Sequence, residues 1–363
     1  MTTYLLAGGG TAGHVNPLLA VADRLREREP DAEILVLGTA EGLEARLVPA
    51  RGYELLTIPK LPFPRRPNRA ALGFPKRLLA TVEQTRRIIR ERQVDIVVGF
   101  GGYVCPPAYL AARRERIPIA IHEANAKPGI ANRLGSLLTK HVGVTFQHTR
   151  LRHGTVVGMP LRSEIETLDA REARGEALAF FGLDAERPTL LVTGGSTGAR
   201  RINETVRESV TLLLGAGWQV LHLTGERAQL DDPGLDGYRL VKYVDRMELA
   251  LSAASLAVSR SGAATVTELG ALGIPAVFVP YPVGNGEQRY NALDMVEDGA
   301  ALLVRDEEFT PAWVRDHLVP LLLDPARVAD MTARAHAAGR RDGADRMVEL
   351  IRNALADRRG LSA

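Results

Sequence analysis

The sequence predicts an α/β protein made of two doubly wound domains, each with a parallel sheet between layers of helices. Short apolar runs alternate with helical patterns along the whole chain. Most of these runs are continuous and rich in β-branched residues, as expected of strands buried on both faces. Glycine-rich turns follow four of the runs, two in each half, where open parallel sheets bind ligands. We therefore expect two nucleotide-binding folds that face each other across a cleft.

The expected strands cover residues 5–7, 34–37, 96–98, 117–121, 142–144, 190–192, 220–223, 240–241, 256–258 and 276–279. Pro160 fixes the backbone between the two glycine-rich halves, so the domains are predicted to span residues 1–160 and 161–340. Residues 341–363 are predicted to form a final helix with one apolar stripe. We expect this helix to pack back toward the N-terminal domain; the alternative is that it stays on its own domain.

The composition limits the class of protein. A chain of 363 residues can bury two hydrophobic cores, and no apolar run is long enough to span a bilayer. No N-terminal signal peptide is expected, because the first apolar run leads into a glycine turn. The single cysteine, Cys105, excludes an internal disulfide and fits a reducing cytosol. We expect it to be a small buried packing residue rather than a nucleophile.

Positive charge is concentrated between residues 60 and 92, although the net charge is only +3. The basic residues of this stretch are Lys60, Arg65, Arg66, Arg69, Lys76, Arg77, Arg86, Arg87, Arg90 and Arg92. Leucine and phenylalanine side chains are interleaved with them, which suits the surface of an anionic membrane. The alternative is a solvated loop and a helix with a charged outer face. Nucleic acid is not an expected partner, because the stretch lacks a recognisable binding module.

The first glycine turn, residues 8–13, passes from an apolar run into a helix that Asn16 and Pro17 are expected to open. Such a turn can bring a phosphate or polar ligand close to bare main-chain N–H groups. His14 would then lie at the mouth of the pocket, where an imidazole can move a proton near neutral pH. The alternative is a tight turn that only lets the helix pack on the strand.

Glu123 and Asn125 follow another expected strand directly and should lie at the same edge of the sheet, beside His14. A carboxylate and two imidazoles near one pocket are candidates for base catalysis. A metal site is not expected, because no second histidine follows at zinc-site spacing. We expect His122 to be structural and to bond neighbouring backbone.

In the second half, Gly262 permits a close turn after a strand, and the free N–H groups of the next helix face the ligand. The carboxylate of Glu268 could accept hydrogen bonds from two ribose hydroxyls. Its alternative role is to complement the helix dipole. The long polar loop at residues 280–292 carries amide and carboxylate groups suited to sugar hydroxyls.

Together these motifs resemble the MurG family of bacterial transferases, which add N-acetylglucosamine to undecaprenyl-pyrophosphoryl-muramyl pentapeptide in peptidoglycan synthesis. The resemblance covers essentially the whole chain. It rests on residues 9–14, 101–104, 122–125, 194–200, 260–268 and 288–292, in the family's order and spacing. It implies the GT-B architecture, two Rossmann-like domains with the acceptor in the first and UDP-N-acetylglucosamine mostly in the second. Ala12, Ala124 and Cys105-Pro106 depart from the family pattern, which leaves the details of acceptor contact open.

The resemblance also implies site residues. Ser196 and its loop would hold the diphosphate, Arg162 would reach the nucleotide from the hinge, and the main chain of Val244 would meet the uracil. Gly102 and Tyr103 would contact the acceptor. The other implied donor contacts are Ala263, Ala264, Thr265, Val266 and Thr267 in the nucleotide pocket, Glu268 at the ribose, Gln288 at the sugar hydroxyls, and Thr11, Ala12, Gly13 and Asn125 from the first domain.

The implied reaction is a direct displacement that inverts the anomeric carbon of the donor sugar. We expect His14 to be the general base, with Glu123 as its rival or orienting partner. No Asp-x-Asp pair is placed to hold magnesium, so neither a metal nor a cofactor is expected. The lipid tail of the acceptor implies a peripheral enzyme at the cytoplasmic face of the membrane, held there by Arg65, Arg66, Lys76 and Arg77. The alternatives are another UDP-sugar transferase, a UDP-N-acetylglucosamine 2-epimerase, or a non-catalytic sugar-nucleotide sensor.

Overall fold

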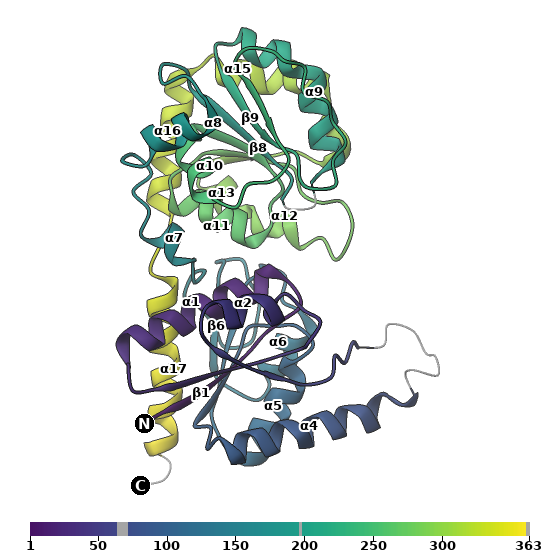
Figure 1. Cartoon of the computed structure of the whole chain (residues 1–363), viewed down its shortest axis with the longest axis vertical. Coiled ribbons are helices and arrows are strands. Elements are labelled where there is room, and N and C mark those ends of the chain that lie inside the picture. Colours follow the sequence, from purple (N-terminus) through teal and green to yellow (C-terminus); the bar gives the residue numbers. More distant parts are fainter. Residues whose placement is uncertain (64–71, 196–197, 361–363) are drawn as a thin grey trace. The chain divides into compact units, whose positions relative to one another are not determined.

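The computed structural model describes residues 1–63, 72–195 and 198–360. The chain divides into two compact units, which we call unit 1 (Met1–Arg162 with Arg341–Ala363) and unit 2 (Ser163–Arg340) (Figure 1). The expected boundary at residues 160/161 lies two residues before this division. Each unit is built around one parallel sheet, so the predicted α/β class is confirmed.

Unit 1 holds a seven-stranded sheet in the order β3-β2-β1-β4-β5-β6-β7. Its elements are β1 (Thr3–Ala7), α1 (Ala12–Arg28), β2 (Glu33–Gly38), α2 (Glu44–Ala50), β3 (Glu54–Thr57), α4 (Phe74–Glu91), β4 (Ile96–Gly99), α5 (Cys105–Glu115), β5 (Ile119–Glu123), α6 (Ile130–Gly135), β6 (His141–Val144), β7 (Gly154–Val156) and α17 (Gly343–Gly360).

Unit 2 holds a six-stranded sheet in the order β10-β9-β8-β11-β12-β13. Its elements are α7 (Ser163–Glu166), α8 (Arg174–Phe181), β8 (Thr189–Thr193), α9 (Arg200–Gly215), β9 (Gln219–Leu223), β10 (Tyr238–Val241), α10 (Met247–Ala253), β11 (Leu256–Ser259), α11 (Ala263–Ala271), β12 (Ala276–Phe278), α12 (Glu287–Asn291), α13 (Leu293–Glu297), β13 (Ala301–Leu303), the 3₁₀ turn η1 (Asp306–Glu308), α14 (Pro311–Trp313), the π-helical turn η2 (Val314–Leu318), α15 (Val319–Leu322) and α16 (Pro325–Ala338).

The two sheets share one topology, in which the strand order reverses beside the first strand of each unit. β1 pairs in parallel with both β2 and β4, and β8 pairs in parallel with both β9 and β11. In such sheets ligands bind outside the carboxyl ends of the strands at the point of reversal. The four glycine turns follow β1, β4, β8 and β11. Each pair of turns therefore flanks the expected ligand position of its unit.

Side chains of β1 alternate between two cores, one on each face of the unit 1 sheet. Tyr4 and Leu6 pack with residues of α1 and α17, whereas Leu5 and Ala7 pack with residues of α4 and α5. This arrangement explains the continuous apolar runs, because a strand covered on both faces has no solvent side. None of the helices in the described parts of the chain is both long and apolar enough to cross a membrane.

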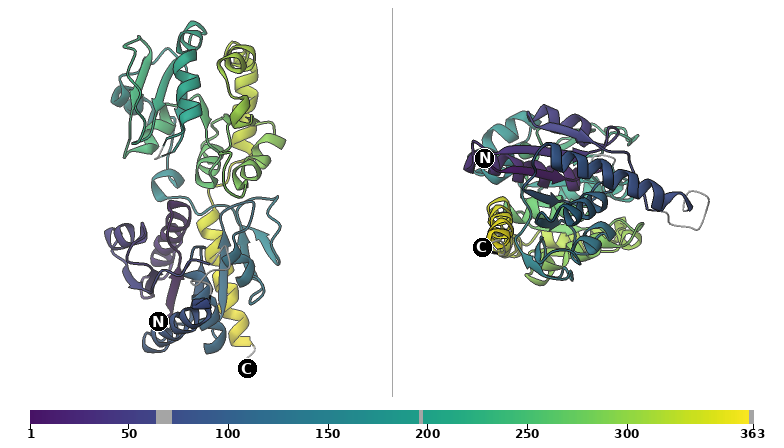
Figure 2. Two further views of the ribbon diagram at one scale, coloured as in Figure 1. Left: turned by 90° about the vertical axis from the view of Figure 1, so that its right-hand side faces the viewer. Right: turned by 90° about the horizontal axis from the view of Figure 1, so that it is seen from below.

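The final helix, α17, packs on unit 1, against α1 and across β5 and β6 (Figure 2). Met347, Val348 and Ile351 are fully buried in the core that α1 also lines. Ion pairs join the same two helices, with Arg24 Nη1 2.5 Å from an Asp345 carboxylate oxygen.

Some sequence expectations differ from the structure. β3, β7 and β13 were not expected, since they are only three or four residues long and lack a continuous buried pattern. Helix α1 begins at Ala12 rather than at Asn16, and Pro17 lies inside it. Thr11 is still extended, so the helix starts as soon as the glycine turn ends. His14 consequently lies within the first turn of α1 and not ahead of it.

Candidate functional site

In the first glycine turn, two main-chain N–H groups already donate hydrogen bonds to acceptors within the protein. The Gly8 N–H donates to the Leu37 carbonyl at 3.2 Å, and the Gly10 N–H donates to Glu44 Oε2 at 2.8 Å. Gly10 has φ +89°, a conformation that favours glycine. The expectation that the turn presents bare N–H groups to a ligand is therefore wrong at Gly8 and Gly10.

Glu44, at the start of α2, is a buried carboxylate beneath this turn. Besides the Gly10 N–H it accepts the Thr39 N–H at 2.9 Å and the Thr39 hydroxyl at 2.8 Å. Burial opposes its ionisation, but the hydrogen bonds from Gly10, its own backbone and Thr39 outweigh burial and hold the pKa of Glu44 below its usual value. No motif in the sequence indicates a role for Glu44 in the turn.

His14 lies between the two glycine turns of unit 1. Its Nδ1 is 3.1 Å from the Gly9 carbonyl oxygen and 3.3 Å from the Thr11 hydroxyl. On the other side of the ring, a Cβ at Gly101 would come within 2.9 Å of Nε2. Gly101 has φ +101°, so both space and backbone conformation favour glycine there. The turn after β4 thus leaves the Nε2 edge of the imidazole uncrowded.

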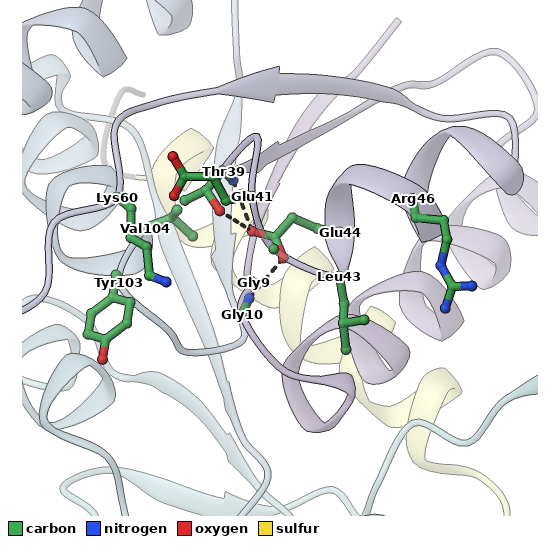
Figure 3. Close-up of a pocket in the computed structure, with 11 residues that line it drawn as sticks. Gly9, Gly10, Thr39, Glu41, Leu43, Glu44, Arg46, Lys60, Tyr103 and Val104 are labelled. Carbon is green, nitrogen blue, oxygen red and sulfur yellow. Dashed lines mark hydrogen bonds between the residues drawn. The ribbon is translucent and has the colours of Figure 1, made fainter. Parts of the chain in front are cut away.

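A cavity of about 340 Å³ opens beside these turns (Figure 3). Gly9 and Gly10 line it from the first turn, and Tyr103 and Val104 line it from the second. Its other lining residues come from the β2–α2 connection, α2 and the chain after β3: Thr39, Glu41, Gly42, Leu43, Glu44, Arg46 and Lys60. The expected acceptor contact Tyr103 therefore borders a hollow that also holds cationic side chains.

Glu123 ends β5 and anchors the loop that follows. Its two carboxylate oxygens accept the N–H groups of Asn125 and Gly129 and the Asn132 amide, each at 3.0 Å. Burial raises the pKa of Glu123, and these bonds and the His14 charge oppose the rise. The Glu123 oxygens thus hold the loop after β5 in place.

His122 and Cys105 are buried structural groups, as expected. His122 Nε2 lies 3.0 Å from the Gly158 carbonyl, and burial lowers its pKa to about 4. The Cys105 thiol lies 3.2 Å from the Ala7 carbonyl, and burial raises its pKa to about 11. At neutral pH the imidazole is uncharged and the thiol protonated, so neither is prepared for proton transfer or attack.

In unit 2, helix α11 begins directly after β11 and its glycine turn. Gly262 is extended and caps the helix, whose first internal bond runs from the Val266 N–H to the Gly262 carbonyl at 3.0 Å. The N–H groups of Ala263, Ala264 and Thr265 precede that bond and point out of the helix end. Glu268 is the sixth residue of α11, beyond the first turn where a helix dipole acts, so the dipole alternative is not supported.

Two more polar donor candidates, one on α11 and one on α12, already have hydrogen-bond partners within the protein. The Thr267 hydroxyl donates to the Ala263 carbonyl at 2.8 Å, and Gln288 Oε1 accepts the Tyr281 N–H at 2.9 Å. Val266 is buried in the core, so only its main chain can face a ligand.

Arg260 fixes the loop that precedes Gln288. Its Nη1 donates to Asp306 at 2.6 Å and to the Val279 carbonyl at 2.9 Å. The motif around Gly262 was recognised from the sequence, but the bond to Asp306 joins distant segments and leaves no local signal.

The remaining predicted site residues lie in separate segments of the chain, and some lie outside the described residues. Ser196, Arg65 and Arg66 lie outside the described residues. Arg162 ends the first segment of unit 1. Val244 follows β10 and lines a cavity of about 430 Å³ with Phe180 and Phe181 of α8.

Ion pairs with glutamates offset part of the positive charge of the basic stretch. Arg86 and Arg90 both bind Glu115, at 2.6 and 2.9 Å, and Arg92 binds Glu54 at 2.7 Å. Lys76 and Arg77 are exposed near the start of α4, where Leu72 and Leu79 are 84% and 56% exposed. Exposed cationic and apolar side chains therefore lie close together in the sequence at the beginning of α4.

Comparison with known proteins covers both units. Residues 4–144 match the glycosyltransferase family 28 N-terminal domain, and residues 189–347 match the glycosyltransferase family 28 C-terminal domain. A protein of Leifsonia xyli subsp. xyli is 63% identical over 356 residues, which make up 98% of this chain and 99% of that protein. It is named UDP-N-acetylglucosamine–N-acetylmuramyl-(pentapeptide) pyrophosphoryl-undecaprenol N-acetylglucosamine transferase.

Solved structures share the folds of both units. The crystal structure of Acinetobacter baumannii MurG has a TM-score of 0.79 at 28% identity and covers 97% of this chain and 100% of that chain. The UDP-GlcNAc 2-epimerase of Neisseria meningitidis, bound to UDP-GlcNAc, has a TM-score of 0.69 at 14% identity and covers 97% of this chain and 100% of that chain. The second likeness concerns the fold alone.

Proposed function

We propose that this chain, which belongs to glycosyltransferase family 28 and within it to the MurG transferases, moves N-acetylglucosamine from UDP-N-acetylglucosamine to undecaprenyl-pyrophosphoryl-muramyl pentapeptide. The chain has the GT-B fold, and its activity is that of a glycosyltransferase in peptidoglycan synthesis. The observation that carries this proposal is the 63% identity, over 98% of the chain, to a transferase of that name.

The chemistry assigned to the site is one inverting displacement. The C4 hydroxyl of the muramyl sugar attacks the anomeric carbon, the bond from that carbon to the diphosphate oxygen breaks, and UDP leaves with the electron pair. His14 Nε2 takes the hydroxyl proton. The N–H groups at the start of α11 face the growing charge on the diphosphate, with the turn around Ser196 as their counterpart. Glu268 binds the ribose, and Gln288 the donor sugar.

Divalent metal is not needed for this displacement, because main-chain N–H groups meet the charge that a metal would otherwise neutralise. The decisive assay measures UDP release from UDP-N-acetylglucosamine with and without the lipid-linked muramyl acceptor, in EDTA and in magnesium. We expect release only with the acceptor and at equal rates in both media. Release that ignores the acceptor, or donor binding without release, would contradict transfer. Loss of turnover in EDTA that magnesium restores would contradict the metal-free mechanism.

The lipid tail of the acceptor places the reaction at a membrane, and we assign peripheral attachment at the cytoplasmic face to the start of α4. Lys76 and Arg77 supply the positive charge, and Leu72 and Leu79 supply the apolar contact. Arg65 and Arg66 belong to the same expected patch but lie outside the described residues.

Reversal of Lys76 and Arg77 to glutamate should weaken binding to anionic vesicles by at least roughly 30-fold. Loss of two cations worth about 1 kcal/mol each accounts for that factor, and repulsion of the two new carboxylates adds to it. Vesicle sedimentation at low and high salt measures the change, and wild-type binding should fall with salt. The matched control reverses Arg327 and Arg334, which are exposed on α16 of unit 2. Equal vesicle binding by the two double variants would rule out this attachment surface.

A further inference from the structure

The peptide group that joins Gly9 to Gly10 is hydrogen-bonded at both ends. Its N–H donates to Glu44 Oε2 at 2.8 Å, and its carbonyl oxygen lies 3.1 Å from His14 Nδ1. In a trans peptide these two groups point in opposite directions. A carbonyl only accepts, so the second contact requires a proton on Nδ1. One peptide plane therefore links a buried carboxylate to the imidazole.

We propose that Glu44 is a positioning residue that orients His14 through the Gly9–Gly10 peptide, an inference that rests on the proposed role of His14 as the base. The carboxylate polarises the peptide, which makes the Gly9 carbonyl a stronger acceptor. That carbonyl holds the proton on Nδ1. Nε2 is left with its lone pair, which is the state a base needs to take the acceptor proton.

The surroundings of Glu44 keep its carboxylate charged and fixed. Three donors from Gly10 and Thr39 hold the two oxygens, and the pKa of Glu44 lies below its usual value. Two glycines enclose it as well. A Cβ at Gly9 would lie 2.4 Å from Glu44 Oε1, and a Cβ at Gly42 would lie 2.1 Å from Oε2. The absence of a side chain at position 9 therefore makes room for the carboxylate.

Glu123, which the sequence offers as either a rival base or an orienting partner, makes different contacts from those of Glu44. Its oxygens accept hydrogen bonds from Asn125, Gly129 and Asn132, so its carboxylate is committed to the loop after β5. The Thr11 hydroxyl is also near Nδ1, at 3.3 Å, but a hydroxyl both donates and accepts and so does not select a tautomer. The Gly9 carbonyl only accepts, so it selects the tautomer with the proton on Nδ1.

Nitrogen-15 spectra of histidine-labelled full-length protein read the tautomer directly, whether or not the protein is active. The His14→Ala spectrum identifies the His14 signals among those of eight histidines. We expect a proton on Nδ1 in the wild type and a mixture of tautomers in Glu44→Gln. Glu44→Asp, which keeps the charge but draws it away from Gly10, should also lose the preference. A wild-type tautomer in whichever variant folds would overturn the proposal.

Kinetic measurements distinguish a Glu44 that orients His14 from a Glu44 that only supports the glycine turn. Glu44→Gln should lower kcat about 10- to 100-fold, the loss expected when a hydrogen bond to a charged group is removed, with the KM for UDP-N-acetylglucosamine unchanged. Loss of the negative charge also destabilises the imidazolium, so the acid limb of kcat/KM should move to lower pH.

The control for charge is Glu41→Gln, which removes an exposed carboxylate from the same cavity. This variant should keep the wild-type tautomer of His14 and the wild-type acid limb of the kcat/KM profile. A fall in kcat of Glu44→Gln with an unmoved acid limb would mean that Glu44 only supports the turn. If the wild type transfers no sugar, the proposed function fails, and the spectra still decide whether Glu44 orients His14.

Discussion

His14→Ala is expected to lose at least about a hundredfold of turnover while binding UDP as the wild type does. A positioned general base contributes roughly 10²- to 10⁴-fold, and the C4 hydroxyl is a weak nucleophile until its proton leaves. UDP binding should persist because the residues assigned to the nucleotide belong largely to unit 2, whereas His14 belongs to unit 1.

UDP release measures the turnover of this variant, and calorimetry with UDP measures its binding. His336→Ala is the matched control, since it removes an exposed histidine from α16 of unit 2. Glu123→Gln tests the rival base. This variant should lose less turnover than His14→Ala, because the Glu123 oxygens already accept hydrogen bonds from the loop after β5. Near-normal turnover in His14→Ala would remove that residue from the role of base.

The fold class could be predicted from the sequence because strands covered on both faces leave continuous apolar runs. The runs before the four glycine turns became β1, β4, β8 and β11. The short strands left no such signal. β3 is exposed at both ends, and β7 begins with a glycine and is largely exposed. Their pairing is decided by neighbouring strands rather than by their own pattern.

The motif residues of the site could be predicted, but the contacts that hold them could not. Glu44 lies in the first turn of α2, a position that indicates only a favourable helix charge. Its function depends on Gly10, 34 residues earlier in the chain. Arg260 likewise depends on Asp306, 46 residues later. Long-range partners of this kind arise from the topology, which brings separate turns to one edge of the sheet.

Acidification should destabilise both units, because each buries a neutral histidine. Burial lowers the pKa of His122 in unit 1 and of His222 in unit 2 to about 4, from an ordinary value of 6.5. Between those values the unfolded chain binds the proton and the folded chain does not, so stability falls as pH falls. The full stability is present above pH 6.5, and about 3 kcal/mol per histidine is lost by pH 4.

Burial keeps both imidazoles neutral, and the hydrogen bonds define which ring nitrogen carries the single proton. Among the described residues, His122 Nδ1 is buried and has no hydrogen-bond partner, so a proton there would be a buried donor without an acceptor. His222 lies between Asn203 Oδ1, 3.1 Å from Nε2, and the Tyr238 hydroxyl, 2.8 Å from Nδ1. The Asn203 amide donates to the Thr224 carbonyl, so its oxygen is the end that faces His222 and fixes the proton on Nε2.

Urea unfolding at pH 7.5, 6.5, 5.5 and 4.5 measures this loss, with probes that report each unit separately. His222→Gln should flatten the pH dependence of unit 2 alone, since glutamine does not titrate, even though the variant is less stable at every pH. His336→Ala should keep the wild-type slope, because that histidine is exposed. Stability that is constant from pH 7.5 to 4.5 in the wild type would show that these imidazoles take up protons in the folded protein. The buried networks around His122 and His222 would then have to open to water without unfolding.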